Sequence, residues 1–174
     1  DLGNLDSSMA ARAAAQVVDT LRQARDYKKA EEEAEAASKK WPEDRTLRVV
    51  RANLLADVGK TNEAVAEIKK TFDGKNDREG HLTLAQIYEK GKSYNEMAKE
   101  VDAAEKLSTT NEEKEAIYFM RGAMLEKQKK HEASEVEFKK LLAMNPNSAS
   151  ALNYLGYMLA DRNVRVPEAL DMIR

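Results

Sequence analysis

The 174-residue chain contains no cysteine, which excludes disulfide bonds, thiolate metal sites and cysteine nucleophiles. Only three prolines and seven glycines interrupt it, so long stretches are free to form helices. Aromatic residues make up 6% of the chain, although 42% is apolar and a core can form. No apolar run approaches the roughly 18 residues that span a bilayer. We expect a helical, soluble chain, and these absences do not distinguish cytoplasm from periplasm.

The chain also lacks a strong excess of positive or negative charge. Charged residues make up 34% of the chain and nearly cancel, with a net charge of −2. This balance is typical of well-solvated helices rather than of a disordered tail. There is no basic stripe and no strongly basic pI, so we expect no nucleic-acid partner.

A pattern of large and small residues recurs about every 34 residues. Its clearest copy is marked by Tyr118, Gly122, Leu125, Ser134, Phe138, Leu141 and Pro146. The same frame gives copies at residues 11–44, 45–77, 78–111 and 115–148, with a partial copy at 149–174. Residues 1–10 are an N-terminal tail or the end of a preceding repeat. Each copy predicts one helical hairpin that must stack on its neighbours to bury its apolar face.

Small residues recur at one place on the predicted helices, where two helices can approach closely, except on the second helix of the copy at 78–111, where Met97 replaces the small residue. They are Val18, Ala52, Ala85, Gly122 and Gly156 on the first helices, and Ala30, Ala64, Ser134 and Ala169 on the second. A glycine inside a helix costs about 1 kcal/mol relative to alanine, so close packing is the reason we assign to Gly122. Gly59 and Gly91 fall near the turns between paired helices, where a positive φ is useful.

These repeated positions resemble the tetratricopeptide repeat family over residues 11–174. The resemblance implies an all-α, right-handed superhelical solenoid of stacked antiparallel helix pairs, about five units with the last incomplete. The stretch from Asn153 to Asp161 looks like repeats of bacterial proteins. Arg121 replaces the family's usual leucine in the clearest copy, and the copy at 78–111 departs most from the pattern.

The resemblance also implies a binding groove, because the family's inner surface comes mainly from the first helix of each pair. Carrying those positions over gives seven groove candidates: Val49, Asn53, Leu82, Gln86, Phe119, Asn153 and Tyr157. Apolar members would form a stripe, and amides beside it could hydrogen-bond a peptide backbone. Packing between repeats is an equally open interpretation for Val49 and Leu82. No lysine occupies the position that some family members use to hold a terminal carboxylate, so we expect no such clamp.

We expect no catalytic, cofactor-binding or metal-binding residues and no enzyme activity. His81 and His131 lie far apart, where the repeat normally has a packing aromatic, and both are interpreted as structural. Residues 59–61 imitate the end of a phosphate loop, but Leu54 stands where its leading glycine should be.

The favoured hypothesis is a scaffold that binds a peptide or helix of a partner protein whose identity the sequence does not give. Two alternatives stay open. One is self-assembly into a homo-oligomer through the ends of the solenoid, where Leu170 and Ile173 have no following helix to cover them. The other is a tethering segment of a longer multidomain protein.

Overall fold

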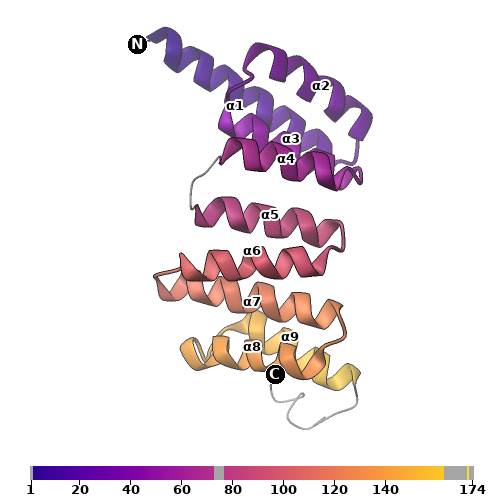
Figure 1. Cartoon of the computed structure of the whole chain (residues 1–174), viewed down its shortest axis with the longest axis vertical. Helices are drawn as coiled ribbons and strands as arrows, with labels where there is room; N and C mark the ends of the chain where they lie inside the picture. The colour runs from indigo at the N-terminus through magenta and orange to yellow at the C-terminus, as the bar shows by residue number, and fades with distance from the viewer. Residues whose placement is uncertain (1, 73–76, 163–171, 173–174) are drawn as a thin grey trace. The chain divides into compact units, whose positions relative to one another are not determined.

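The computed structural model describes residues 2–72, 77–162 and 172, and these form helices without any strand. The helices are α1 (Leu2–Gln23), α2 (Tyr27–Lys40), α3 (Arg45–Asp57), α4 (Thr61–Thr71), α5 (Arg78–Lys90), α6 (Tyr94–Lys106), α7 (Asn111–Lys127), α8 (His131–Met144) and α9 (Ala149–Asp161) (Figure 1). The fold is an all-α helical-repeat solenoid. Each of the first four predicted copies holds one helix pair, and α9 is the first helix of the last copy.

The chain divides into two compact units, residues 1–100 and 101–174, and each is described by itself. The first contains α1 to α5 and the beginning of α6. The second contains the remainder of α6 and α7 to α9. The predicted final helix from residue 167, including Ala169, Leu170 and Ile173, lies outside the described residues apart from Met172. Among the described helices, none is both long and apolar enough to cross a membrane.

Residues 2–10, for which the sequence predicted an N-terminal tail or the end of a preceding repeat, belong to α1. They continue α1 as a regular helix, and this segment leaves Leu5 and Met9 exposed. Residues 4–11 contain no proline and no glycine, so the helix runs through them without interruption.

The predicted crossing points are fully buried in both units. Val18, Ala52, Ala85, Ala30, Ala64 and Ser134 have no exposed surface. In the second unit, a methyl group added to Gly122 would lie 2.8 Å from the Phe138 ring. Ser134 Oγ also donates a 2.7 Å hydrogen bond to the Gly122 carbonyl, which joins α7 to α8 where they cross. The role predicted for the small residues is confirmed at these positions.

Large side chains fill the space beside the crossings. In the first unit Ile68, Phe72, Leu84 and Ile87 form one cluster with Ala52 and its neighbours. In the second unit the cluster contains Phe138, Leu141, Leu155, Met158 and Leu159. Burial of such residues is worth about 1.5–3 kcal/mol each, and it supplies the main favourable term for each unit.

The turns between paired helices use positive φ at one fixed place. Arg25, Gly59, Lys92 and Lys129 adopt φ of 62°, 87°, 57° and 62° at equivalent positions of their copies. The prediction for Gly91 was therefore wrong, since its φ is −82° and Lys92 carries the left-handed conformation instead. Gly91 is needed for space: a methyl group there would lie 2.6 Å from Thr61 Oγ1.

The structure explains why α7 has Arg121 where the repeat usually has a leucine. Arg121 lies between carboxylates of α6 and α8, with Nη2 2.8 Å from Asp102 and Nη1 2.5 Å from Glu105 and 3.4 Å from Glu137. Glu137 is buried and also receives Lys140 Nζ at 3.0 Å. A leucine would remove a positive charge from buried Glu137 and from the two more exposed carboxylates of α6, and weakening the pairing of a buried carboxylate is costly.

The Gly122 contact gives a test of the crossing. Gly122→Ala gains about 1 kcal/mol of helix propensity, but overpacking against the Phe138 ring typically costs 1–3 kcal/mol. We expect a net loss of about 1 kcal/mol in urea unfolding. In a Phe138→Leu background the same change should become neutral or stabilising. An equal loss in both backgrounds would contradict the assigned contact.

Candidate functional site

The first helices of the first unit carry four of the predicted groove residues. α1, α3 and α5 lie side by side, with α3 in contact with both of the others. Val49 and Leu82 are half-buried, and Val49 packs against the core cluster of that unit. Asn53 and Gln86 lie one helical turn further along α3 and α5, and Gln86 is exposed. Along α3 and α5, an apolar residue is therefore followed one turn later by an amide. Val49 is partly exposed on this surface and also packs against the core.

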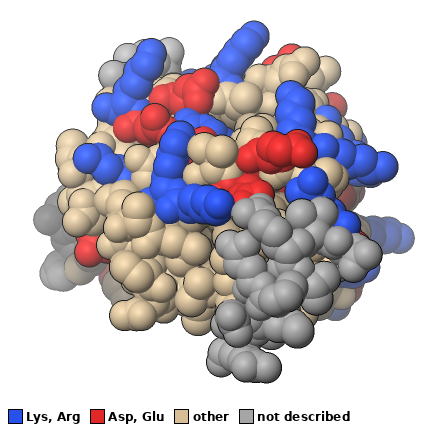
Figure 2. All heavy atoms as spheres, turned by 90° about the horizontal axis from the view of Figure 1, so that it is seen from below, with Lys and Arg blue, Asp and Glu red and all other residues tan. Residues whose placement is uncertain are grey.

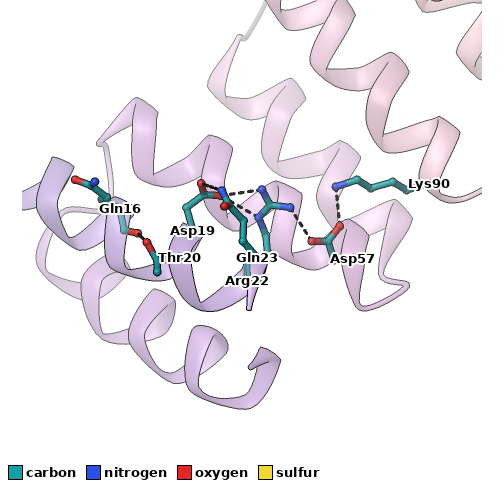
Figure 3. A network of polar contacts seen from close by, with 7 residues as sticks. All are labelled: Gln16, Asp19, Thr20, Arg22, Gln23, Asp57 and Lys90. Carbon is teal, nitrogen blue, oxygen red and sulfur yellow. Dashed lines mark hydrogen bonds and ion pairs between the residues drawn. The ribbon is translucent and has the colours of Figure 1, made fainter. Parts of the chain in front are cut away.

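One turn beyond these residues, an ion-pair network joins the three first helices (Figure 3). Asp57 of α3 accepts hydrogen bonds from Arg22 Nη1 of α1 at 2.8 Å and from Lys90 Nζ of α5 at 2.6 Å. Arg22 also donates through Nε and Nη2 to Asp19, at 3.0 and 2.8 Å. Gln23 donates to the other Asp19 oxygen at 2.7 Å. The network fixes the spacing of α1, α3 and α5 at the C-terminal end of the surface.

The Asp57 carboxylate is the centre of this network, with a side chain only 15% exposed. Burial alone would raise the pKa of Asp57, but the hydrogen bonds and positive charges of Lys90 and Arg22 hold that pKa below its ordinary value of 3.8. The charged form is therefore the one that the fold stabilises.

The second unit carries the other three groove candidates. Phe119 does not stand free, because its ring meets Phe138 edge-on at 5.6 Å and Tyr154 edge-on at 5.8 Å between centroids. It is half-buried and belongs to the rim of the core cluster. Asn153 is exposed, and Tyr157 is exposed to 62%, an unusual fraction for a large aromatic residue.

An open cavity of about 640 Å³ lies beside Tyr157, between α7 and α9. Its described lining residues are Glu126, Tyr154, Tyr157, Met158, Ala160 and Asp161. Two rings and a thioether give it apolar walls, and two carboxylates stand at the ends of the two helices. This volume lies within the range of ordinary ligand sites, about 300–1,000 Å³.

Both histidines have structural partners. His81 Nδ1 lies 2.6 Å from Glu100 Oε2, and His131 Nδ1 lies 2.8 Å from Glu126 Oε2. Both rings are partly buried. Within the described residues, no group of three or more His, Asp or Glu side chains could hold a metal ion. Figure 2 shows acidic and basic side chains beside one another in the upper part of its view.

Sequence reasoning missed the Asp57 network and the cavity. Arg22, Asp57 and Lys90 are the twelfth or thirteenth residues of consecutive copies, but the chain contains so many charged residues that their pairing was not evident from the sequence. Glu126 is the twelfth residue of its copy and Asp161 the thirteenth of the next, and these two acidic residues near the ends of adjacent first helices were the available signal.

The pKa of Asp57 gives a second test. Because the folded value is depressed, this stabilisation is complete above the unfolded pKa, near 3.8, and is lost as pH falls through the folded value. We expect Asp57→Asn to lower the free energy of unfolding by about 1–2 kcal/mol at pH 7 and by less at a pH well below 3.8, where the carboxylate begins to be protonated in the folded chain as well.

Glu35→Gln is the matched control for that experiment, since the Glu35–Lys39 pair is mostly exposed. Such a pair contributes little, so this variant should unfold like the wild type at both pH values. A difference between wild type and Asp57→Asn that is independent of pH would contradict the network.

Comparison with solved structures supports the fold. PilF of Pseudomonas aeruginosa superposes with a TM-score of 0.71 and 17% identity, covering 97% of this chain and 77% of that one. MamA of Desulfovibrio magneticus RS-1 gives 0.65 and 15%, covering 96% and 91%. YrrB, described as a TPR protein with an unusual peptide-binding site, gives 0.55 and 18%, covering 91% and 80%.

No curated protein matches the chain in sequence. The tetratricopeptide repeat profile matches residues 16–74 and 119–174. The region between these matches contains the copy whose sequence departs most from the pattern, although the structure forms α5 and α6 there. The matched segments cover more than half of the chain, and their helix pairs cross at the small residues expected of such repeats. The chain therefore belongs to the tetratricopeptide repeat family.

Proposed function

We propose that the chain is a non-catalytic scaffold that holds a peptide or helix of a partner protein on the inner faces of its first helices. The cavity between α7 and α9 carries this proposal, because it combines apolar walls with an aromatic side chain that is 62% exposed. Exposed aromatic residues beside a cavity are typical anchors of protein interfaces. The peptide-binding site that gives YrrB its description is a precedent on the same fold.

The surface of the first unit supports the same role. Gln86 is exposed and Asn53 is half-buried, and both amides lie beside half-buried apolar residues. An amide can donate to and accept from the main chain of an extended peptide, while the apolar neighbours take its side chains. The ion pairs around Asp57 hold this surface in shape before a ligand arrives, which reduces the ordering cost of binding.

The contacts of Phe119 determine which probes are suitable. Charging Phe119 would disrupt its ring contacts with Phe138 and Tyr154, so a loss of binding would not separate the groove from the fold. Tyr157 is a better position because an aromatic photo-crosslinker can replace it without burying new groups. Val136 of α8, an exposed apolar residue on a second helix, is the matched control at 52% exposure.

We expect p-benzoylphenylalanine at position 157 to form adducts with a partner in source cells under ultraviolet light, while the same probe at position 136 does not. Adduct yield should fall at least fivefold when Asn153→Arg is added, because that exposed residue lies one turn away on α9. Circular dichroism checks that helicity is unchanged. Adducts at 136 alone would move the binding surface to the second helices and contradict the proposal.

Self-assembly is a second candidate, favoured by a strip on α1. Leu5, Met9 and Val17 are exposed there at four- and eight-residue spacing, and Ala13 and Val17 line an open cavity of about 480 Å³. A helix surface of this kind marks an interaction site.

Sedimentation velocity tests this candidate. Association through α1 predicts a mass that rises with concentration and a Met9→Glu/Val17→Glu variant that stays monomeric. The control is Glu31→Gln, an exposed position of α2, which should leave the mass unchanged. A wild type that is monomeric at all concentrations would exclude the candidate.

A further inference from the structure

The geometry of the cavity between α7 and α9 points to a specific partner chemistry. We infer that it receives a positively charged side chain, lysine or arginine, presented by the bound peptide, and this rests on the proposed function. The charges at the rim of the cavity, its apolar walls and its contrast with the ion pairs of the first unit all favour such a side chain.

The rim of the cavity is negative. Glu126 and Asp161 both line it. Glu126 Oε2 is held 2.8 Å from His131 Nδ1, while no described side chain pairs with its other oxygen. Asp161 is exposed and forms no ion pair with the described residues. Neither Lys127 nor Arg162 is among the described lining residues, and Arg162 Nη2 is turned to Glu132, 3.5 Å away.

The helix ends add to this negative potential. α7 ends at Lys127 and α9 at Asp161, so the cavity lies where the last carbonyl groups of both helices are found. A helix C-terminus carries about half a negative charge and favours a cation nearby. The last turn of α9 contains no basic residue to satisfy that preference, and the last turn of α7 contains Lys127, which is not among the described lining residues.

The walls match the rest of a long basic side chain. Tyr154, Tyr157 and Met158 offer two rings and a thioether to the methylene groups of lysine or arginine. A tyrosine face also attracts an ammonium or guanidinium group within about 6 Å. An apolar stem with a charged tip therefore fits both parts of the cavity, whereas an acidic side chain would face two carboxylates.

The first unit shows how this repeat satisfies an aspartate at the same position. Asp57 and Asp161 are both the thirteenth residue of their copies, and each is the last residue of its helix. Asp57 is neutralised by Arg22, the twelfth residue of the preceding copy, and by Lys90 (Figure 3). In α7 the residue equivalent to Arg22 is Glu126. The chain thus places a second carboxylate where the first unit places a cation, and an incoming side chain would supply the missing charge.

Two model peptides isolate the charge. Acetyl-Leu-Arg-Leu-amide and acetyl-Leu-citrulline-Leu-amide have nearly the same shape, but only the first is cationic. We expect the arginine peptide to shift the amide NMR signals of residues 154–161 of the whole chain, in a saturable way, and to bind at least fivefold tighter than the citrulline peptide. The preference should shrink as salt is raised, because exposed charges are screened.

Single substitutions locate the effect. Asp161→Asn should reduce the preference for arginine at least threefold, and Glu126→Gln should act in the same direction. Glu112→Gln, an exposed carboxylate near the opposite end of α7, is the control and should leave the preference intact. Asp161→Asn is the cleaner variant, since Glu126 also contacts His131.

The outcomes separate this inference from the proposed function. Equal binding of both peptides with shifts at residues 154–161 would overturn the charge preference and leave the groove as a peptide site. Shifts elsewhere, or an equal effect of Glu112→Gln, would overturn the assignment of the cation to this cavity. If neither peptide binds, the inference of a cationic side chain is also overturned. The crosslinking experiment at position 157 tests the scaffold role independently.

Discussion

The close approach of two helices in each pair is the constraint on which the rest of the structure depends. It favours residues without a bulky side chain where the helices approach, and the buried alanines of the first unit and the Gly122–Ser134 contact of the second meet this need, whereas buried Met97 takes this place on α6. Once the helices approach, Phe138 can lie across Gly122, and Tyr154 can stack on Phe138 at 4.7 Å. The lining of the cavity is thus built outward from the crossing.

The repeated spacing of small and large residues was enough to predict the helix pairs, because burial acts on every copy in the same way. The spacing was not enough to predict how far Phe119 is buried. Tyr118, Phe119 and Met120 are consecutive large residues, and any of them could lie on the apolar face of the helix. Their burial is decided by neighbours on other helices, here Phe138 and Tyr154. The prediction for Gly91 was wrong for a similar reason. A glycine can be needed either for a positive φ or for space beside a neighbouring residue, and only the contact with Thr61 shows that space is the reason here.

The candidate site was predicted only in outline. The positions that face inward follow from the repeat frame, but the partner of a charged residue at such a position lies on a different copy. Asp57 is paired across both neighbouring first helices, whereas Asp161 has no described partner. The same residue at the same position can therefore be structural in one unit and available to a ligand in the other. Sequence periodicity alone does not separate the two situations.

The left-handed residues at the turns have a consequence for proteolysis. Three of the four are arginine or lysine, and all three are exposed. A trypsin-like protease needs several residues around the cleaved bond to be extended, and a tight turn with positive φ at that residue does not offer this shape. Cleavage after Arg25, Lys92 or Lys129 thus requires the hairpin to open first. Trypsin digestion under native conditions would report the opening of three different hairpins, each from its own pair of fragments.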